Sequence, residues 1–410
     1  RLDASEFRTP SVVHVGEAGC LVGQSVEVLL DDEPGLPHAR HFKLAMGENR
    51  GAYADGSGRD WWPPALSALV LRKLMQDIEA FANEPVQGVV VTVPANFDDA
   101  QRRATRDAAT LAGLSRVKLM DEPVAAATYY GFSDRDGDQT LFVYDLGGGT
   151  FDATILQSGD DGLYALATSG SRQLGGKWVD DILADYVLTE FERQYGQRPQ
   201  DAASLQQVRR FAEDAKLQLS RPGKNRVSRT LLVGSHTLDF VITQDHFDRL
   251  IDGLVDQTLE VCAEALARSG LSWSMVDKLL LTGGSSLLPL VTRKLAAASG
   301  KNPEALVCRQ PHQAVAYGAA LLSRQVFGEA AGGAQLQSIC SHDLGIRAVD
   351  PKTRQPTVKV LVGRNTPLPA RARTTFFTTR DDQRRMIIEV VQAQGEGDER
   401  TERSLGHFAF

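Results

Sequence analysis

The residues best suited to chemistry lie in one short run, where two aspartates flank three consecutive glycines. Its polar and glycine positions are Asp145, Gly147, Gly148, Gly149, Thr150 and Asp152. The apolar, β-branched residues on both sides predict strand, tight turn and strand. Backbone N–H groups of a glycine turn form a concave site for an anion. A carboxylate at a strand end suits Mg²⁺, which takes only one or two protein carboxylates. The run predicts a phosphate and magnesium site on a β-hairpin; the alternative is an ordinary hairpin with a glycine-rich turn.

Alternating strands and helices must position this run. Buried strands are predicted where the sequence is continuously apolar, at 86–93, 117–120 and 276–281. Helices are predicted at 65–83, 98–112, 124–130, 179–195, 202–220 and 314–327, several of them opened by proline or acidic residues. Only short strands and turns are predicted at 1–35, and residues 36–60 show little hydrophobic periodicity. The alternation is typical of an α/β fold.

Two further glycine turns precede helices. Thr282, Gly283, Gly284 and Ser285 connect a buried strand to the helix that follows Pro289. The segment 174–177 has a superficial likeness to a P-loop, but Trp178 stands where that motif needs a serine or threonine.

The composition changes at Gly328. Residues 329–342 are small and polar, as in a linker. Short β-like runs follow at 357–362, 374–379, 386–392 and 405–410, separated by turn residues, with no helical pattern. This indicates a second, all-β unit.

Composition limits the classes of function. The 410 residues are 42% hydrophobic and carry a net charge of −7, which argues against a general nucleic-acid binder. No apolar run approaches the roughly 18 residues that span a bilayer. The four cysteines form no CxxC pair and are expected to be reduced cytosolic thiols, which predicts a cytoplasmic protein. Both ends read as cut, so we expect a fragment truncated at both ends.

Several motifs together carry a family resemblance. They are Val91-Thr92-Val93-Pro94 with the helix after it, Asp121-Glu122-Pro123, the run from Asp145 to Asp152, the turn from Leu279 to Ser285, Leu344-Gly345-Ile346 and Ser404-Leu405-Gly406. In this order and spacing, over essentially the full chain, they resemble the 70-kDa heat-shock chaperones of the DnaK type. The resemblance implies an actin-like two-lobed ATPase domain at 1–328, an interdomain linker at 329–342, and a partial β-sandwich that binds peptides at 343–410.

The resemblance also implies roles for residues around an ATP/ADP and Mg²⁺ site. The glycines 147–149 and Thr150 would hold the phosphates, Asp145 the magnesium shell, and Asp152 the attacking water. Lys43 falls on the catalytic lysine, and Glu122 on the glutamate that supports hydrolysis. The nucleoside would lie between two groups of residues, Gly283, Gly284 and Ser285 on one side and Glu213, Lys216 and Ser220 on the other.

Other positions are implied in communication and peptide binding. Pro94 and Arg102 fall where the family relays the nucleotide state; alternatively, Arg102 simply pairs with Asp98 across one helical turn. The resemblance places a pocket for one apolar peptide side chain at Val349, Phe377, Met386 and Ile388.

The chain departs from the family in four places. The opening hairpin Asp-Leu-Gly-Thr-Thr is absent, so residues 1–410 are expected to bind ATP poorly and to hydrolyse it negligibly. Leu217 stands where many relatives carry an arginine, and His312 where an acidic residue is common. The linker segment 335–339 is a weak version of the Leu-rich family linker.

The function implied is an ATP-dependent chaperone that binds extended apolar segments of unfolded proteins. Its expected partners are those polypeptides, J-domain proteins and nucleotide-exchange co-chaperones, with no nucleic acid or membrane. Two alternatives stay open: a non-catalytic binding module of the same fold, favoured by Leu217 and His312, and an actin-like small-molecule kinase.

Overall fold

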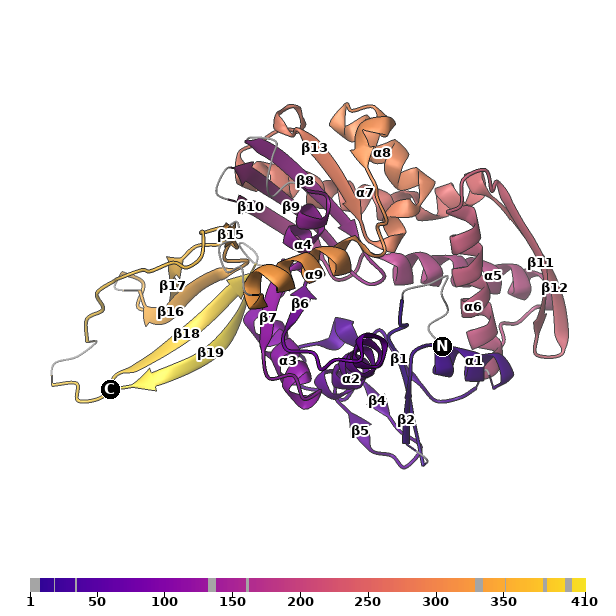
Figure 1. Ribbon diagram of the computed structural model, residues 1–410, viewed down its shortest axis with the longest axis horizontal. Coiled ribbons are helices and arrows are strands. Elements are labelled where there is room, and N and C mark those ends of the chain that lie inside the picture. The colour runs from indigo at the N-terminus through magenta and orange to yellow at the C-terminus, as the bar shows by residue number, and fades with distance from the viewer. Residues whose placement is uncertain are drawn as a thin grey trace.

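The computed structural model describes residues 8–17, 19–33, 35–131, 138–159, 162–328, 335–350, 352–378, 382–394 and 400–410. Figure 1 shows two mixed α/β lobes that meet at helices α4 (Glu122–Tyr129) and α9 (Ala314–Phe327), with a separate sheet of yellow strands at one end. In the described part of the chain, no helix combines the length and apolar character that a membrane span requires.

The second lobe is built on a six-stranded sheet in the order β14-β13-β8-β9-β10-β15. Its strands are β8 (Gln139–Leu146), β9 (Phe151–Gly159), β10 (Gly162–Ser171), β13 (Lys278–Thr282), β14 (Leu306–Val307) and β15 (Gln335–Gln337). Neighbours β8 and β9 are antiparallel, with Asp145 opposite Asp152, whereas β13 runs parallel to β8. The two aspartates of the glycine run therefore face each other at one end of the central strands.

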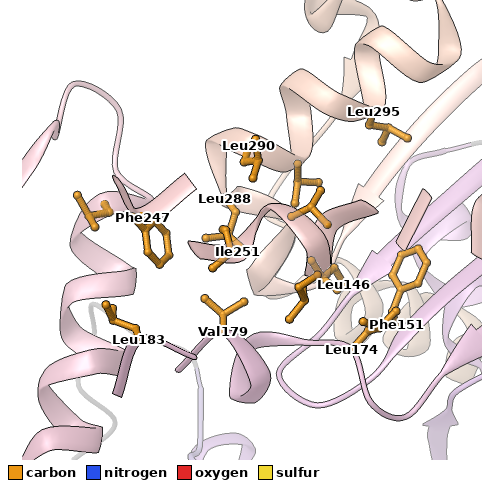
Figure 2. Packing of buried hydrophobic residues seen from close by; sticks show 14 of the residues in the cluster. Leu146, Phe151, Leu174, Val179, Leu183, Phe247, Ile251, Leu288, Leu290 and Leu295 are labelled. Atoms are coloured by element: carbon orange, nitrogen blue, oxygen red, sulfur yellow. The ribbon is translucent and has the colours of Figure 1, made fainter. Parts of the chain in front are cut away.

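Side-chain alternation along β8 supplies two hydrophobic cores, one on each face of the sheet. Phe142, Tyr144 and Leu146 pack with α5 (Gly176–Tyr195), α7 (Gln244–Ser269) and α8 (Pro289–Ser299). Figure 2 shows part of this core, where leucines and phenylalanines of several elements meet. Leu141 and Val143 point the other way, toward α4 and α9. The lobe is completed by α6 (Ala202–Leu219) and the hairpin β11 (Arg226–Val233) and β12 (His236–Thr243).

The described part of the first lobe contains the small sheets and the α-helices that follow. One sheet joins β1 (Val12–Gly16) to β2 (Gly19–Val22) and β3 (Ala39–Arg40); the other is the parallel pair β6 (Val89–Val93) and β7 (Val117–Asp121). The helices are α1 (Gln24–Asp32), α2 (Pro63–Ala82) and α3 (Asp99–Leu111), with the short strands β4 (Tyr53–Ala54) and β5 (Asp60–Trp61) between α1 and α2.

Helix α1 corrects the expectation that residues 1–35 form only strands and turns. Val26 and Leu30, one turn apart, are fully buried against Val12. A nine-residue helix with two buried positions has too short an apolar stripe to be recognised from periodicity, and tertiary packing stabilises it instead.

Crossing of α4 and α9 at the junction of the lobes depends on one glycine. A Cβ atom at Gly318 would overlap the backbone carbonyl of Ala125. Only glycine allows the two helix backbones to approach this closely.

Residues 343–410 contribute one antiparallel sheet in the order β17-β16-β18-β19. The strands are β16 (Asp343–Val349), β17 (Pro356–Val362), β18 (Ile387–Gln394) and β19 (Thr401–Ala409). The predicted strand at 374–379 is wrong over its described part, because 374–378 have no regular structure. One sheet is present among the described residues of this unit, so a sandwich with a second layer stays a prediction.

The predicted linker is partly structured. Residues 329–334 lie outside the described ranges, whereas β15 pairs in parallel with the edge of β10. Ile339 then bridges to Pro367 and is buried. The connection is therefore joined to the sheet of the second lobe at one end and to the β-unit at the other.

Candidate functional site

The glycine turn between β8 and β9 lies against the first turn of α5. The amide of Gly176 donates to the carbonyl of Gly147 at 2.9 Å, and the amide of Lys177 donates to that of Gly148 at 2.7 Å. The Ser285 hydroxyl donates to Gly147 from the opposite side at 2.9 Å. These bonds hold the predicted phosphate turn between the two other glycine turns of the second lobe.

Gly148 is the position of the turn that faces open space. A Cβ atom built on it would meet nothing within 4 Å, although the residue lines the central cavity. The turn therefore presents bare backbone to the cavity, as a backbone anion site requires.

Two buried carboxylates lie directly beneath this turn. Asp145 is 6% exposed and Asp152 is 2% exposed, and they are cross-strand partners. One carboxylate oxygen of Asp152, Oδ1, is buried without a hydrogen-bond partner among the described residues. Two buried acidic groups with an unsatisfied oxygen form an environment that a cation would stabilise.

Lys43 and Glu122 bring opposite charges to the same place from the first lobe. The Lys43 ammonium donates to Glu122 Oε1 at 2.8 Å. Burial opposes the charged form of Lys43, but Glu122, Asp145 and Asp152 outweigh it and raise the pKa of the ammonium. Lys43 is therefore held fully charged beside the carboxylates.

Asp145 and Asp152 hold a proton more tightly than an ordinary aspartate does. Burial, reinforced by the charge of Glu122 and opposed by Lys43, raises the pKa of Asp145 to about 7. Burial also raises the pKa of Asp152 well above the usual range, with Glu122 and Asp145 adding to the effect. Without a further cation beside them, both carboxyl groups therefore hold protons more readily than ordinary aspartates do.

The donor set of this cluster fits a magnesium ion held largely through water. No three His, Cys, Asp or Glu side chains converge as a metal cage in the described ranges. Magnesium does not require such a cage, because it uses one or two carboxylates and keeps several waters. Asp145, a buried carboxyl group at the strand end that also lines the cavity, is the residue that would hold the ion.

The predicted nucleoside residues line the same cavity from α6 and from the turn after β13. Glu213, Lys216 and Ser220 lie on one side and Gly284 and Ser285 on the other, all in its lining. Gly283 begins that turn, and its amide donates to the Pro311 carbonyl at 3.0 Å.

Lys216 is held in place by an acidic partner. Its ammonium donates to Asp180 Oδ2 at 2.7 Å and to the Gly176 carbonyl at 3.3 Å. Burial raises the pKa of Asp180 to about 6, although Lys216 opposes the shift. This pair ties α6 to the start of α5 beside the phosphate turn.

The two departures in the nucleoside region also face the cavity. Leu217 lines it with 46% of its surface exposed. His312 lines it as well, and its Nδ1 lies 3.2 Å from Nη1 of Arg8. At these two positions the cavity wall therefore consists of the apolar side chain of Leu217 and of His312, which lies beside Arg8.

Arg102 bridges the first lobe internally. It donates to Asp121 Oδ1 at 2.8 Å and to the carbonyls of Phe97 and Ala95 at 3.0 and 3.2 Å. The alternative pairing with Asp98 is therefore not observed; Arg103 and Asp99 form the ion pair across one turn of α3. Arg102 connects the loop after Pro94 to Asp121, the residue before Glu122.

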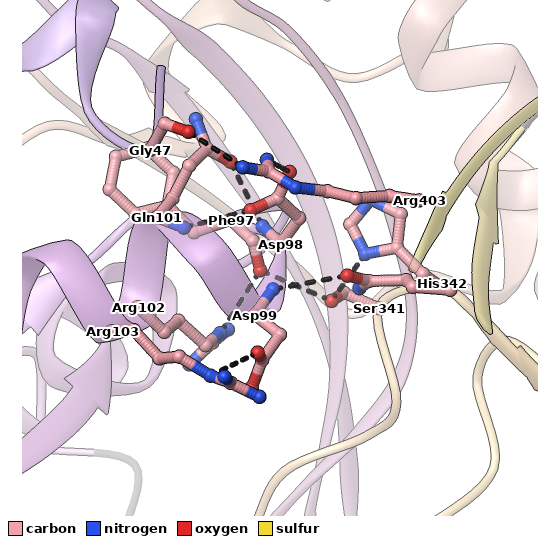
Figure 3. Close-up of polar contacts among 11 residues, drawn as sticks. Gly47, Phe97, Asp98, Asp99, Gln101, Arg102, Arg103, Ser341, His342 and Arg403 are labelled. Carbon is pink, nitrogen blue, oxygen red and sulfur yellow. Dashed lines mark hydrogen bonds and ion pairs between the residues drawn. The ribbon is translucent and has the colours of Figure 1, made fainter. Parts of the chain in front are cut away.

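The β-unit contacts this same loop (Figure 3). Arg403 of β19 lies 3.2 Å from Asp98 Oδ2 and donates to the Gly47 carbonyl at 2.7 Å. The amide of Asp99 donates to Gln392 of β18 at 3.2 Å. Arg102, one of the residues predicted to relay the nucleotide state, therefore contacts the same loop that the β-sheet contacts.

The predicted peptide-pocket residues lie in different parts of the β-unit. Val349 ends β16, Ile388 is in β18, and Met386 precedes β18. Phe377 lies in an irregular segment and is 86% exposed. Their common role stays a prediction.

Sequence reasoning missed the part played by Gly175, Gly176 and Asp180. The segment 174–177 lacks the serine or threonine of a P-loop, yet its glycines pack on the predicted phosphate turn. Two glycines opening a long helix were a usable signal, because helix N-termini attract anions.

The fold and the cleft define a mixed α/β protein of two lobes with a glycine hairpin over buried carboxylates. The model of the family described as Hsp70 protein matches residues 37–410. The chain belongs to the Hsp70 family, whose members are nucleotide-binding chaperones with ATPase activity.

Proposed function

We propose that this chain is an ATP-dependent chaperone that uses the cleft described above to bind and hydrolyse ATP. The observation that carries the proposal is the convergence of the open glycine turn, the Asp145–Asp152 pair and the Lys43–Glu122 ion pair at one point. Phosphoryl transfer to water needs positioning and charge neutralisation more than covalent chemistry, and these groups supply both.

Each residue has a separate task in the proposed reaction. Backbone amides of Gly148, Gly149 and Thr150 receive the terminal phosphates, whereas the Gly147 amide already donates to the Thr150 carbonyl at 3.0 Å. Asp145 would hold a hydrated Mg²⁺, which would neutralise phosphate charge. Lys43, fixed by Glu122, places a positive charge beside the phosphoryl group. The unpartnered Oδ1 of Asp152 accepts a hydrogen bond from the attacking water. Water adds to the terminal phosphorus, the bond to the ADP oxygen breaks, and ADP and phosphate leave.

In the proposed cycle, the nucleotide state controls how residues 343–410 hold extended apolar polypeptides. The contacts of Asp98 and Asp99 with Arg403 and Gln392 support this coupling, since they join the β-unit to the loop that Arg102 connects to Asp121.

Titration of Mg-ATP into protein that carries both phosphate hairpins, and into the same protein with Gly148→Val, tests the proposal. The valine fills the face of the turn that a phosphate would occupy, and its Cβ causes no overlap in the free protein. Gly56→Val is the matched control, because Gly56 also has open space around its Cβ but lies outside the cavity lining. We expect Gly148→Val alone to abolish the heat of binding. Equal binding by all three proteins would refute the phosphate assignment, and binding without turnover would favour the non-catalytic alternative.

A further inference from the structure

The β-unit contains a strongly basic part of an acidic chain. Residues 350–385 include nine lysines and arginines against three aspartates, whereas the net charge of the whole chain is −7. Four of these cations, Lys352, Arg354, Arg384 and Arg385, have exposed side chains. None of the four forms an ion pair within the ranges that the structure describes. A negatively charged partner can therefore reach all four.

Strand direction brings these four cations to one end of the sheet. Strand β16 runs antiparallel to β18, so the end of β16 and the start of β18 lie at the same end. Lys352 and Arg354 lie in the turn between β16 and β17, and Arg384 and Arg385 immediately precede β18. Figure 1 shows this end of the sheet pointing away from both lobes.

The acidic groups at this end do not balance the cations. Among the described residues there, Asp350 and Asp382 carry the carboxylates. Asp350 is engaged within the turn, because its Oδ1 accepts from the amides of Lys352 and Thr353 at 2.7 and 2.8 Å. Two carboxylates against four cations leave a positive surface, which attracts negative groups within a Debye length, about 10 Å in dilute salt.

Apolar side chains are exposed at the same end of the sheet. Val349 ends β16 and is 45% exposed, and Ile387 begins β18 and is 69% exposed. Met386, one of the predicted peptide-pocket residues, directly follows Arg385. The four cations therefore border the place where an apolar peptide side chain is predicted to bind.

We propose that the β-unit prefers extended apolar segments that carry glutamate or aspartate on either side of the apolar core. The inference rests on the proposed function, since it names the kind of polypeptide that the same site selects. Exposed ion pairs are individually weak, so the apolar core supplies most of the affinity and the acidic flanks select among segments. A nucleic acid suits this surface less well, because a long polyanion would also meet the negative charge of the rest of the chain.

Three fluorescein-labelled peptides test the preference by fluorescence anisotropy, without nucleotide and at low salt. The first has a core of leucine and valine flanked by glutamates, the second has the same core flanked by lysines, and the third has glutamates around a core of serine and glycine. We expect the first to bind about tenfold more tightly than the second, with most of this difference lost at high salt. The third should bind more weakly than the first, because it lacks apolar side chains.

Each other result has a separate meaning. Equal affinity of the first two peptides, or a preference for lysine, would overturn the inference while leaving peptide binding intact. Binding of none of the three would refute the peptide binding on which the inference rests. Equal affinity of the first and third peptides, or displacement of the first by an equal concentration of oligothymidine, would identify a plain anion surface and also overturn it.

A protein variant assigns the preference to this end of the sheet. Arg384→Gln combined with Arg385→Gln should remove most of the difference between the glutamate and lysine peptides, without weakening the binding of the lysine peptide. Arg106→Gln combined with Arg249→Gln is the matched control, because it changes the net charge equally at exposed positions of α3 and α7. The control should keep the full preference. If both double variants keep it, the four cations do not select the segment and the inference fails.

Discussion

Arg403 of the β-unit shares the carboxylate that begins helix α3, since its guanidinium lies 3.2 Å from Asp98 Oδ2 while Asp98 Oδ1 accepts from the Gln101 amide at 2.8 Å. Asp98 and Gln101 form a capping box. One side chain therefore stabilises a helix start and a contact between the β-unit and the first lobe.

Arg403→Ala should loosen the contact between the β-unit and the loop before α3 without unfolding either part. The ion pair is partly exposed, and such pairs contribute about 0.2–1 kcal/mol, so the melting temperature should change little. Hydrogen exchange of the Asp99 amide, which bonds to Gln392, should accelerate. Arg373→Ala, at an exposed arginine of the β-unit, is the control. Unchanged exchange in Arg403→Ala would show that the contact does not hold the sheet.

Asp145→Asn should reduce ATP hydrolysis about a hundredfold, since one lost electrostatic contact in an active site costs about 3 kcal/mol of barrier. The fold should survive, because the substitution keeps the shape of the side chain. Steady-state phosphate release measures the effect in protein that carries both phosphate hairpins, with Asp107→Asn as an exposed control. Turnover at the wild-type rate would remove Asp145 from the magnesium site.

The same substitution should change how stability depends on pH. Burial first, and then Glu122, raise the pKa of Asp145 from 3.8 to about 7 in the folded state. The folded protein therefore binds a proton that the unfolded chain has lost, and this contribution to the unfolding free energy falls as pH rises from about 4 to 7.

Asp145→Asn removes this term, which is at most about 1.4 kcal/mol per pH unit. Urea denaturation without Mg²⁺ should show the variant gaining stability over wild type as pH rises from 4 to 8, and Asp107→Asn should show no such gain. Parallel pH profiles for all three proteins would contradict the raised pKa.

Glu122→Ala and Pro94→Gly should affect communication more than nucleotide affinity. Glu122 binds Lys43, and Arg102 connects Asp121 to the loop that follows Pro94. In protein that carries both phosphate hairpins, ATP-stimulated release of a bound peptide should slow in both variants while the ATP dissociation constant changes little. Unchanged release in both would remove these residues from the relay.

The buried hydroxyl pair of Tyr144 and Thr258 should respond unequally to mutation. The two oxygens lie 2.7 Å apart, and Thr258 also donates to the Val255 carbonyl at 2.6 Å. Tyr144→Phe leaves Thr258 satisfied, whereas Thr258→Val leaves a buried phenol unpaired, at a cost of about 1–3 kcal/mol. Chemical denaturation should rank Thr258→Val as the less stable variant. The reverse ranking would contradict the contact.

Local patterns predicted much of the fold. The helix at 314–327 was predicted with the bounds of α9, and the run at 141–156 forms the predicted hairpin, because regular apolar spacing and turn residues determine such elements locally. Helix α1 was missed because two buried residues give too weak a pattern. The sequence left the ion-pair partner of Arg102 undecided. Its pairing with Asp121 depends on tertiary structure, which residue spacing along one helix does not describe.

The candidate site was predicted from type and order of residues, and the structure brings most of those residues to one cavity. The sequence did not predict the contacts that side chains and backbone make between distant parts of the chain. These contacts join Asp180 with Lys216, Arg8 with His312, and Gly176 with Gly147. These residues lie 29 to 304 positions apart, and no local pattern connects them.

The close crossing of α4 and α9 limits which amino-acid substitutions evolution can accept at position 318. A side chain at position 318 meets a main-chain carbonyl, and every amino acid at position 125 carries that carbonyl. No compensating substitution at the contact can therefore restore the fit. The codon for Gly318 should tolerate only synonymous change in a folded lineage, whereas Ala125 is free to vary within its own packing limits.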